Sequence, residues 1–503
     1  MPLSALRHLP PTWLLAPVLG AAAVLCFAPF SLFWAAPLAW LGLFLLFERS
    51  HNPRQAAVTG GLFGLGFFLA GVSWVFVSLS VFGGMPAWLA APATFLFCAV
   101  LALYPGLSGF LYRRWRPPAF WQRSLFFAAC IAGTDWLRAW LFTGFPWLAL
   151  GYSQTPPSPL AGFAPVLGVF GLSFLLAWLA AALARPRLGL PLAALLALSG
   201  FGLQQIHWSE AHGPALRVAL VQGNIPQEMK FDRTAFIQTL QLYRELIASH
   251  PADLTILPET ALPTFVDYLP REYLDELASL ARQQGGNILF GTLTGDPDGA
   301  YFNSAVSLGA APAQVYSKQH LVPFGEFIPP GFAWFMAQAH IPMSSFSAGA
   351  GGGETLTFGS DAARYQVAVN ICYEDAFGEE IIRALPAAGL LANLSNTAWF
   401  GDSLAQPQHL QIARLRALET GRPMLRATNT GMTALIDAQG QIQAQLPPFT
   451  RGVLQVEVRP HRGATPYSRS GNWGALALML LAVVLSRKRS CAPDRKSRDT
   501  LAP

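Results

Sequence analysis

The sequence has few charged residues. Lys, Arg, Asp and Glu make up 12% of its 503 residues, about half of the roughly 25% found in soluble globular proteins, whereas hydrophobic residues make up 53%. This composition excludes a single water-soluble enzyme. It also excludes a disordered chain, because apolar residues dominate, and a collagen-like fibre, because the 45 glycines and 40 prolines follow no period.

The shortage of charge is uneven along the chain. Residues 1–209 contain ten basic and two acidic residues, which leaves 48 charged residues for 210–503. We therefore predict a membrane part joined to a water-exposed part. The net charge of +6 does not indicate a nucleic-acid partner, because most basic residues of the first part lie in the connections between apolar segments, where they act as topology signals.

Three segments lack charged residues altogether: 13–47, 55–112 and 139–184. Because a helix needs about 20 apolar residues to cross a bilayer, these segments must hold several spans. Division at Pro, Gly and Arg predicts about eight helices, near 12–28, 31–47, 56–80, 86–112, 120–142, 163–184, 188–206 and 472–486.

Basic residues fall in alternate connections between these helices. They are Arg7; Arg49 and Arg54; Arg113, Arg114, Arg116 and Arg123; Arg185 and Arg187; and Arg487, Lys488 and Arg489. Basic loops stay in the cytoplasm, so both termini are predicted there, with the long segment before the last helix outside. The expected domains are a membrane domain (1–206), an extracytoplasmic domain (207–470), a last span (471–487) and a basic tail (488–503).

Two ionisable residues, Asp135 and Arg138, interrupt the fifth predicted span. Such groups at membrane depth are candidates for function. They are also three residues apart on one helical face, near the outer end of the span. We favour the second interpretation, a structural pair that docks the external domain.

Cysteine is scarce too, with five residues in all. Cys26, Cys98 and Cys130 fall in apolar spans, and Cys491 falls in the tail. The external domain thus has only Cys372 and cannot form an internal disulfide. The count alone leaves open whether its thiol is buried filler or a reactive group.

Motifs for metals and nucleotides are also missing. The nine histidines are dispersed, and the sequence has no CxxC pair, HExxH run, Walker loop or GxGxxG fingerprint. We expect neither a metal nor a cofactor.

The external domain has the pattern of an α/β fold. Apolar strands are predicted at 218–222, 254–259, 287–293, 365–373 and 390–396, and helices at 233–249, 271–284, 377–385 and 407–420. Strands that alternate with helices indicate a largely parallel sheet. Ligands of such sheets bind beyond the carboxyl ends of the strands.

Three reactive side chains are expected at such ends. Glu259 ends LTILPE, Lys318 follows AQVYS, and Cys372 ends YQVAVNIC. Singly, each has a structural explanation: a capping Glu, a solvated Lys or a core Cys. Together they make one mechanism, in which the carboxylate takes the thiol proton, the sulfur attacks an acyl group and the ammonium stabilises the oxyanion.

The motifs that carry these residues, PET (258–260), YSK (316–318) and NICYED (370–375), resemble the nitrilase, or carbon–nitrogen hydrolase, superfamily. That resemblance implies an αββα sandwich. Longer segments resemble the apolipoprotein N-acyltransferase family: WLFTGFPW (140–147), QGNIPQ (222–227), LPETALP (257–263), LVPFGEFIP (321–329), NTAWFGD (396–402), QHLQIARLRALETGRP (408–423) and ATNTG (427–431).

This resemblance implies that Glu259 is the general base, Lys318 the electrostatic stabiliser and Cys372 the nucleophile. It also implies site roles for Glu326, Tyr373 and Glu374, although the two Glu residues have alternative explanations as helix caps or loop salt bridges. Where the family often has Trp after QGNIPQ, this sequence has Phe231.

The implied reaction is a two-step acyl transfer. A phospholipid, typically phosphatidylethanolamine, donates its acyl chain to the cysteine, and the α-amino group of a diacylated apolipoprotein accepts it. The implied location is the bacterial inner membrane, with the catalytic domain in the periplasm.

An apolar stretch gives independent support for lipid substrates. Residues 331–349 include Phe332, Trp334, Phe335, Met336, Met343 and Phe346 and no charged residue. Such a loop is expected to meet the bilayer or cover an acyl channel, with GAGGG (349–353) as its hinge. The alternative is an ordinary buried loop.

Two other functions are weighed against acyl transfer. A membrane-tethered amidase would use the same Glu, Lys and Cys, but it gives no reason for the spans before the domain. A transporter with a solute-binding domain would need polar groups inside several spans, and only Asp135 and Arg138 are present.

Overall fold

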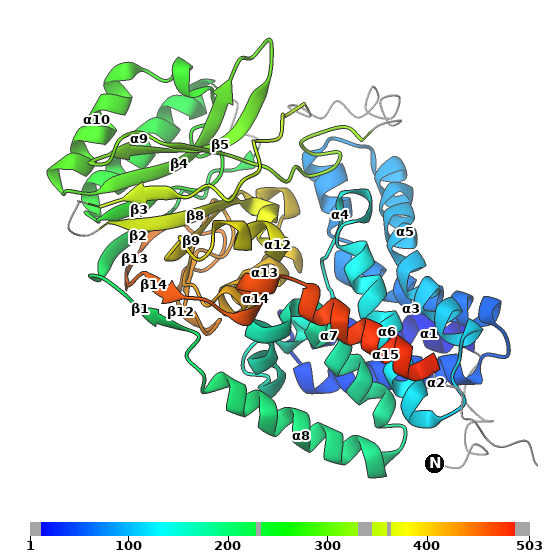
Figure 1. Ribbon diagram of the computed structural model, residues 1–503. Coiled ribbons are helices and arrows are strands. Elements are labelled where there is room, and N and C mark those ends of the chain that lie inside the picture. Colours follow the sequence, from blue (N-terminus) through cyan, green and yellow to red (C-terminus); the bar gives the residue numbers. More distant parts are fainter. Residues whose placement is uncertain (1–11, 228–232, 330–344, 360–363, 488–503) are drawn as a thin grey trace, which may run out of the picture.

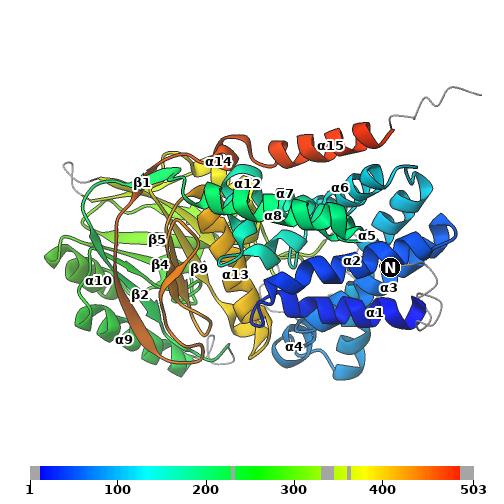
Figure 2. The same ribbon diagram turned by 90° about the horizontal axis from the view of Figure 1, so that it is seen from below.

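The computed structural model of the chain describes residues 12–227, 233–329, 345–359 and 364–487. A helical part and an α/β part lie side by side in two views at right angles (Figures 1 and 2). The last helix returns from the α/β part to the helical part, so the two ends of the described chain belong to the same part (Figure 2).

The helices of the helical part lie near the predicted positions. They are α1 (Thr12–Ala23), α2 (Ala36–Arg49), α3 (Pro53–Val72), α4 (Val75–Val77), α5 (Ala87–Arg114), α6 (Phe120–Arg138), α7 (Ala164–Ala182), α8 (Pro186–Gln204) and α15 (Trp473–Arg487). The helix expected over 120–142 ends early, at Arg138, and the backbone then becomes left-handed at Phe142, Thr143 and Gly144.

Four helical segments of the described residues are long and apolar enough to cross a membrane: Pro53–Val72, Ala87–Arg114, Pro159–Ala182 and Pro186–Gln204. Large apolar side chains on this part face outward; Trp88 is 77% exposed and Leu198 is 72% exposed. A contiguous apolar surface of this kind is stable in lipid and costly in water. The total of about eight spans stays a prediction.

The α/β part is a sandwich of two six-stranded sheets. The first has the order β13-β2-β3-β4-β5-β6 and the second the order β12-β11-β10-β9-β8-β7. Three central strands of each sheet are parallel, and the outer strands are antiparallel.

The strands are β1 (Ser209–Ala211), β2 (Leu216–Gln222), β3 (Leu254–Ile256), β4 (Asn287–Gly295), β5 (Tyr301–Gly309), β6 (Val315–Ser317), β7 (Leu356–Phe358), β8 (Tyr365–Ile371), β9 (Leu390–Ser395), β10 (Met424–Thr428), β11 (Ala434–Ile436), β12 (Ile442–Gln445), β13 (Gly452–Val458) and β14 (His461–Gly463). Strands β1 and β14 form a separate pair.

Helices cover the outer face of each sheet. Helices α9 (Arg233–Ser249) and α10 (Arg271–Gln283) pack on the first sheet, and α12 (Gly378–Ile381) and α13 (Ala405–Thr420) pack on the second (Figure 1). The four layers are the αββα sandwich that the resemblance implied. The helix predicted over 377–385 is short, because a 3-10 turn at Ile382–Ala384 replaces its second half.

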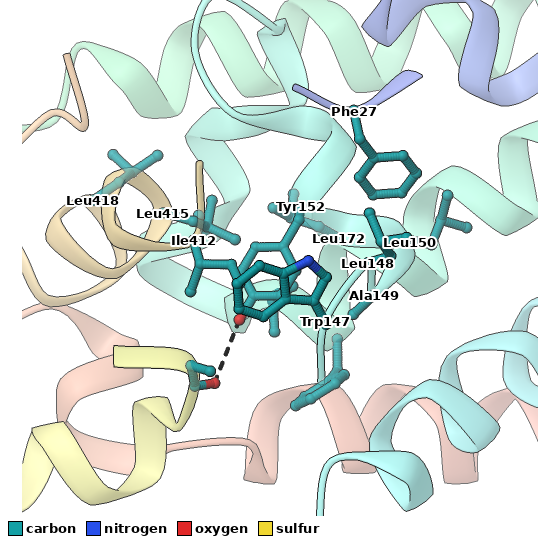
Figure 3. Packing of buried hydrophobic residues seen from close by; sticks show 14 of the residues in the cluster. Phe27, Trp147, Leu148, Ala149, Leu150, Tyr152, Leu172, Ile412, Leu415 and Leu418 are labelled. Carbon is teal, nitrogen blue, oxygen red and sulfur yellow. Dashed lines mark hydrogen bonds between the residues drawn. The ribbon is translucent and has the colours of Figure 1, made fainter. Parts of the chain in front are cut away.

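Helix α13 lies between its sheet and the helical part (Figures 1 and 2). Because both sides are covered, its polar residues are buried and must find partners. Trp147 Nε1 donates to Gln408 Oε1 at 2.7 Å, and the Ala28 N–H donates to Gln411 Oε1 at 3.1 Å. Figure 3 shows the apolar side chains of α13 beside Trp147 and Tyr152.

Glycine allows the helices of the helical part to approach closely. A Cβ on Gly66 of α3 would lie 2.0 Å from the carbonyl oxygen of Pro17 in α1, whereas a Cβ on Gly133 of α6 would meet no atom within 4 Å. Both residues lie in helices, so the same substitution tests packing at one position and helix propensity at the other.

We expect Gly66→Ala to lower stability by about 1–3 kcal/mol, because two backbones must move apart. Gly133→Ala should be neutral or stabilising, by up to about 1 kcal/mol, because alanine favours the helix. Thermal unfolding of the purified protein in detergent would measure both. Equal midpoints for the two variants would contradict the packing described above.

Candidate active site

The structure brings Glu259 and Lys318 together at one end of the sandwich. Lys318 Nζ lies 3.4 Å from Glu259 Oε1 and 2.8 Å from Glu326 Oε1, and its side chain is 1% exposed. Cys372 is buried in the same site, where its thiol interacts electrostatically with Glu259, Lys318 and Glu326. The site therefore combines a thiol, an ammonium and two carboxylates.

Cys372 begins a tight turn and does not end a strand. Strand β8 stops at Ile371, and the 3-10 helix Cys372–Ala376 follows directly. The φ of Cys372 is 55°, a left-handed conformation that costs energy for a residue with a side chain. Asn393 of β9 helps to hold this turn, because its Nδ2 donates to the Cys372 carbonyl at 3.0 Å.

Glu259 lies on a turn beyond β3, three residues after that strand ends. Asn303 Nδ2 donates to its Oε1 at 2.8 Å, and the Asn396 N–H donates to its Oε2 at 2.8 Å. Gly291 makes room for the turn, since a Cβ there would lie 2.4 Å from the Thr260 nitrogen. Both carboxylate oxygens are thereby fixed.

Glu326 completes the ionic cluster. Asn303 Nδ2 also donates to Glu326 Oε1, at 3.0 Å, so one amide bridges the two carboxylates. The Val322 N–H donates to Glu326 Oε2 at 2.8 Å. Glu326 thus touches the same ammonium as Glu259 and belongs to the site.

Glu374 lies beside the site and braces its backbone. It accepts hydrogen bonds from the N–H groups of Ile371, Gln319 and His320 and from the Tyr316 hydroxyl, at 2.6 to 3.1 Å. Burial raises the pKa of this carboxyl. These contacts join the segment after Lys318 to the turn of Cys372, and the bond from the Ile371 N–H is a helix cap, one of the two alternative explanations of Glu374.

Tyr373 faces the helical part. Its hydroxyl donates to the Gly144 carbonyl at 3.1 Å, and its ring stacks on that of Phe145, with centroids 6.3 Å apart and the ring planes at 29°. The residue after the candidate nucleophile is therefore held by the segment between α6 and α7.

Sequence reasoning missed a buried polar network behind Cys372. Arg426 Nη1 donates to Asn393 Oδ1 at 2.6 Å and to Asp375 Oδ2 at 3.0 Å, and His409 Nε2 lies 2.9 Å from Asp375 Oδ1. The network orients the Asn393 amide toward the Cys372 carbonyl. A signal for it in the sequence was Arg426, a charged residue within the short strand β10.

Two sequence expectations involve residues outside the described part of the chain. Phe231 is one of them, and residues 331–344 of the apolar stretch over 331–349 are the other. In the described end of that stretch, the Phe346 N–H donates to the Glu326 carbonyl at 2.9 Å, and the Gly349 N–H donates to the Lys318 carbonyl at 2.8 Å. The C-terminal end of the stretch therefore adjoins the site.

The electrostatics of the site suit a protonated thiol in the resting enzyme. Burial raises the pKa of the Cys372 thiol, Glu259 raises it further, and Lys318 lowers it less. Burial disfavours the Lys318 ammonium, but Glu326 and Glu259 outweigh that effect, so its pKa is raised and it stays charged. Attack by sulfur thus requires a base to take the proton during the reaction, and Glu259 is suited to do so.

Comparisons with known proteins cover both parts of the chain. Two family models match it: "Apolipoprotein N-acyltransferase N-terminal domain" over residues 19–182 and "Carbon-nitrogen hydrolase" over residues 217–467. A protein of Nitrosomonas europaea named apolipoprotein N-acyltransferase is 49% identical, over 92% of this chain and 95% of its own. The protein of that name from Chromobacterium violaceum is 45% identical, over 95% and 94%.

Among solved structures, an amidase from Nesterenkonia sp. aligns with 18% identity and a TM-score of 0.37. The alignment covers 49% of this chain and 92% of the amidase. The similarity to the two relatives above spans nearly the whole chain, whereas this one is confined to about half of it.

The charges around Cys372 predict how its reactivity depends on pH. Alkylation by iodoacetamide needs the thiolate, so it should be slow at neutral pH and rise at alkaline pH. Glu259→Gln removes a negative charge that raises the thiol pKa, so the profile should move to lower pH. Mass spectrometry of the Cys372 peptide would follow the reaction.

Glu272→Gln, an exposed site on α10, is the control and should leave the profile unchanged. A Glu259→Gln profile that stayed in place, or moved to higher pH, would show that the carboxylate does not act on the thiol.

Proposed function

The chain belongs to the apolipoprotein N-acyltransferase family, and from this premise we propose that it moves an acyl chain from a phospholipid to the α-amino group of a diacylated apolipoprotein. The observation that carries the proposal is the buried group of Cys372, Lys318 and Glu259, built beside a helical part with an apolar outer surface. Phosphatidylethanolamine is the proposed donor, and the product is a triacylated lipoprotein.

In the first half-reaction, Glu259 takes the proton of the Cys372 thiol as the sulfur attacks the ester carbonyl of the phospholipid. The new C–S bond gives a tetrahedral oxyanion, which the Lys318 ammonium stabilises. When the C–O bond breaks, Glu259 returns the proton to the leaving oxygen. A lysophospholipid departs, and the acyl chain remains as a thioester.

In the second half-reaction, the α-amino group of the apolipoprotein attacks the thioester carbonyl. Glu259 accepts the proton of the amine as the C–N bond forms, and Lys318 stabilises the second oxyanion. The C–S bond breaks, the thiolate regains a proton from Glu259, and the amide product leaves. Each half-reaction returns the base to its starting state, which suits a ping-pong cycle.

The remaining residues of the site are assigned supporting roles. Glu326 shares the Lys318 ammonium and the Asn303 amide with Glu259, so it fixes the ammonium close to the general base. Tyr373 and Glu374 hold the turn that carries Cys372. None of these roles requires a metal or an organic cofactor.

The proposed location is the bacterial inner membrane. Residues 1–206 and 471–487 would span it, residues 207–470 would lie in the periplasm, and the tail 488–503 would lie in the cytoplasm. Alternate basic loops and the exposed apolar side chains of the helical part support this arrangement.

The test is acylation of the enzyme by phospholipid alone. The purified full-length protein, incubated with phosphatidylethanolamine in detergent, should gain one fatty acyl mass on Cys372, and hydroxylamine should remove it. Cys372→Ala should abolish the adduct, and Glu259→Gln should slow its formation by about 10²–10⁴-fold. Glu272→Gln should behave as wild type, because Glu272 is exposed on α10.

An adduct that survives in Cys372→Ala would refute the assignment of the nucleophile. Turnover of a small amide such as propionamide without lipid, together with no acyl adduct, would replace acyl transfer with an amidase activity.

A further inference from the structure

Arg138, at the end of α6, holds the segment that contacts Tyr373. Its side chain is 2% exposed, and its Nη1 donates to the carbonyls of Phe145 and, at 2.7 Å, Trp147. Both acceptors are backbone atoms, so the guanidinium fixes the path of the chain and not only its side chains. We call residues 144–147 the Arg138-held turn.

Asp135 fixes the guanidinium in turn. Its Oδ1 accepts from Arg138 Nη2 at 3.3 Å, and its Oδ2 accepts from the Leu150 N–H at 2.8 Å and from the Ser173 hydroxyl at 3.0 Å. The ion pair expected from the sequence therefore forms. It ties α6 to the connection between α6 and α7, at Leu150, and to Ser173 of α7 itself.

The backbone before the Arg138-held turn has an unusual conformation. The φ values of Phe142, Thr143 and Gly144 are 56°, 73° and 89°. A Cβ on Gly144 would lie 2.0 Å from the Ala139 carbonyl oxygen, so this path needs glycine. Left-handed residues with side chains persist only where surrounding contacts impose them, and the Arg138 contacts do so here.

The turn then reaches the candidate nucleophile. The Gly144 carbonyl accepts a hydrogen bond from the Tyr373 hydroxyl at 3.1 Å, and the Phe145 ring stacks on the Tyr373 ring. Tyr373 directly follows Cys372, whose left-handed backbone also needs support from its neighbours. A continuous set of contacts therefore links Arg138 of the helical part to Tyr373, the residue that directly follows Cys372.

We propose that Arg138 is a positioning residue for acyl transfer, acting through the Arg138-held turn and Tyr373 on the orientation of Cys372. The inference rests on the proposed function and adds to it that the helical part belongs to the catalytic apparatus. In positioned reactions, a misplacement of about 1 Å can cost about 10²-fold in rate. Arg138 lies outside the site and needs no contact with either lipid.

A purely structural role for Arg138 is the alternative. Trp147, whose carbonyl Arg138 also binds, packs on His409 with ring centroids 5.4 Å apart and donates to Gln408. Loss of Arg138 would then loosen the joint between the two parts and reduce the amount of folded enzyme. That effect changes the number of active sites and leaves the rate constant of each one unchanged.

The first experiment compares Arg138→Gln with Arg123→Gln. Arg123 lies at the other end of α6, where its Nη1 is 2.6 Å from Glu48 Oε2, so both variants lose one partly or fully buried ion pair of the same helix. The rate constant of single-turnover acylation by phosphatidylethanolamine, measured on the fraction of the enzyme that becomes acylated at the end point, should fall about 10²-fold in Arg138→Gln. It should stay at the wild-type value in Arg123→Gln, and the lipid concentration for half-maximal rate should not change in either.

The second experiment is a double-mutant cycle with Tyr373→Phe, which removes the hydroxyl that donates to Gly144. If Arg138 acts through Tyr373, the double variant should be no slower than the slower single variant, because both changes break one path. Losses that multiply would overturn the proposal, as would equal rate constants for Arg138→Gln and Arg123→Gln. Arg138→Lys keeps the charge but not the forked donor, and its rate should lie between those of Arg138→Gln and wild type.

Should Arg138→Gln fail to fold, Phe145→Leu takes its place in the cycle. It removes the ring that lies against Tyr373 and leaves the Arg138 contacts with the backbone in place. The proposal would be supported if Phe145→Leu slowed acylation and the double variant with Tyr373→Phe were no slower than the slower single variant. A wild-type rate in Phe145→Leu would overturn it. Wild-type protein that gains no acyl mass would instead refute the proposed function, so the two failures are distinguishable.

Discussion

One buried ammonium between two carboxylates determines how the site is built. Lys318 is almost inaccessible to water, and charges in such a place are tolerated only when paired and fully hydrogen-bonded. The cluster contains one more carboxylate than ammonium, so the remaining oxygens need neutral donors. The Asn303 amide and the N–H groups of Asn396 and Val322 supply them. Removing any partner would leave a buried charge without compensation.

These donors come from strands and loops that are far apart in the chain, so the site exists only when the whole sandwich is closed. Glu259 lies beyond a strand of one sheet, and the turn of Cys372 follows a strand of the other. The second sheet in turn depends on α13, whose outer face is completed by the helical part. The geometry of the site therefore depends on the docking of the helical part against the α/β part.

The sequence predicted the elements of this structure better than their ends. Apolar runs located the helices and the central strands, but β3 and β8 stop before Glu259 and Cys372, because the local backbone must turn where the chemistry is. Reactive residue types at strand ends pointed to the site. The supporting amides gave no signal, because Asn303 and Asn393 resemble ordinary polar residues until distant strands are paired. The spacing of Arg138 and Asp135 predicted an ion pair. The backbone carbonyls that Arg138 also binds could not be predicted, because they belong to an irregular turn without a helical or strand pattern in the sequence.

The double coverage of α13 also constrains how the protein can be made. In a water-soluble enzyme, the outer face of such a helix would be polar and wet, whereas here it carries apolar side chains that contact the first part of the polypeptide (Figure 3). A fragment that began after α8 would leave this face uncovered and would aggregate in an aqueous compartment. The helices that precede α13 in the chain must therefore be in place before its outer face can be covered. The α/β part could be secreted as an independent protein only if the apolar residues on the outer face of α13 were replaced by polar ones.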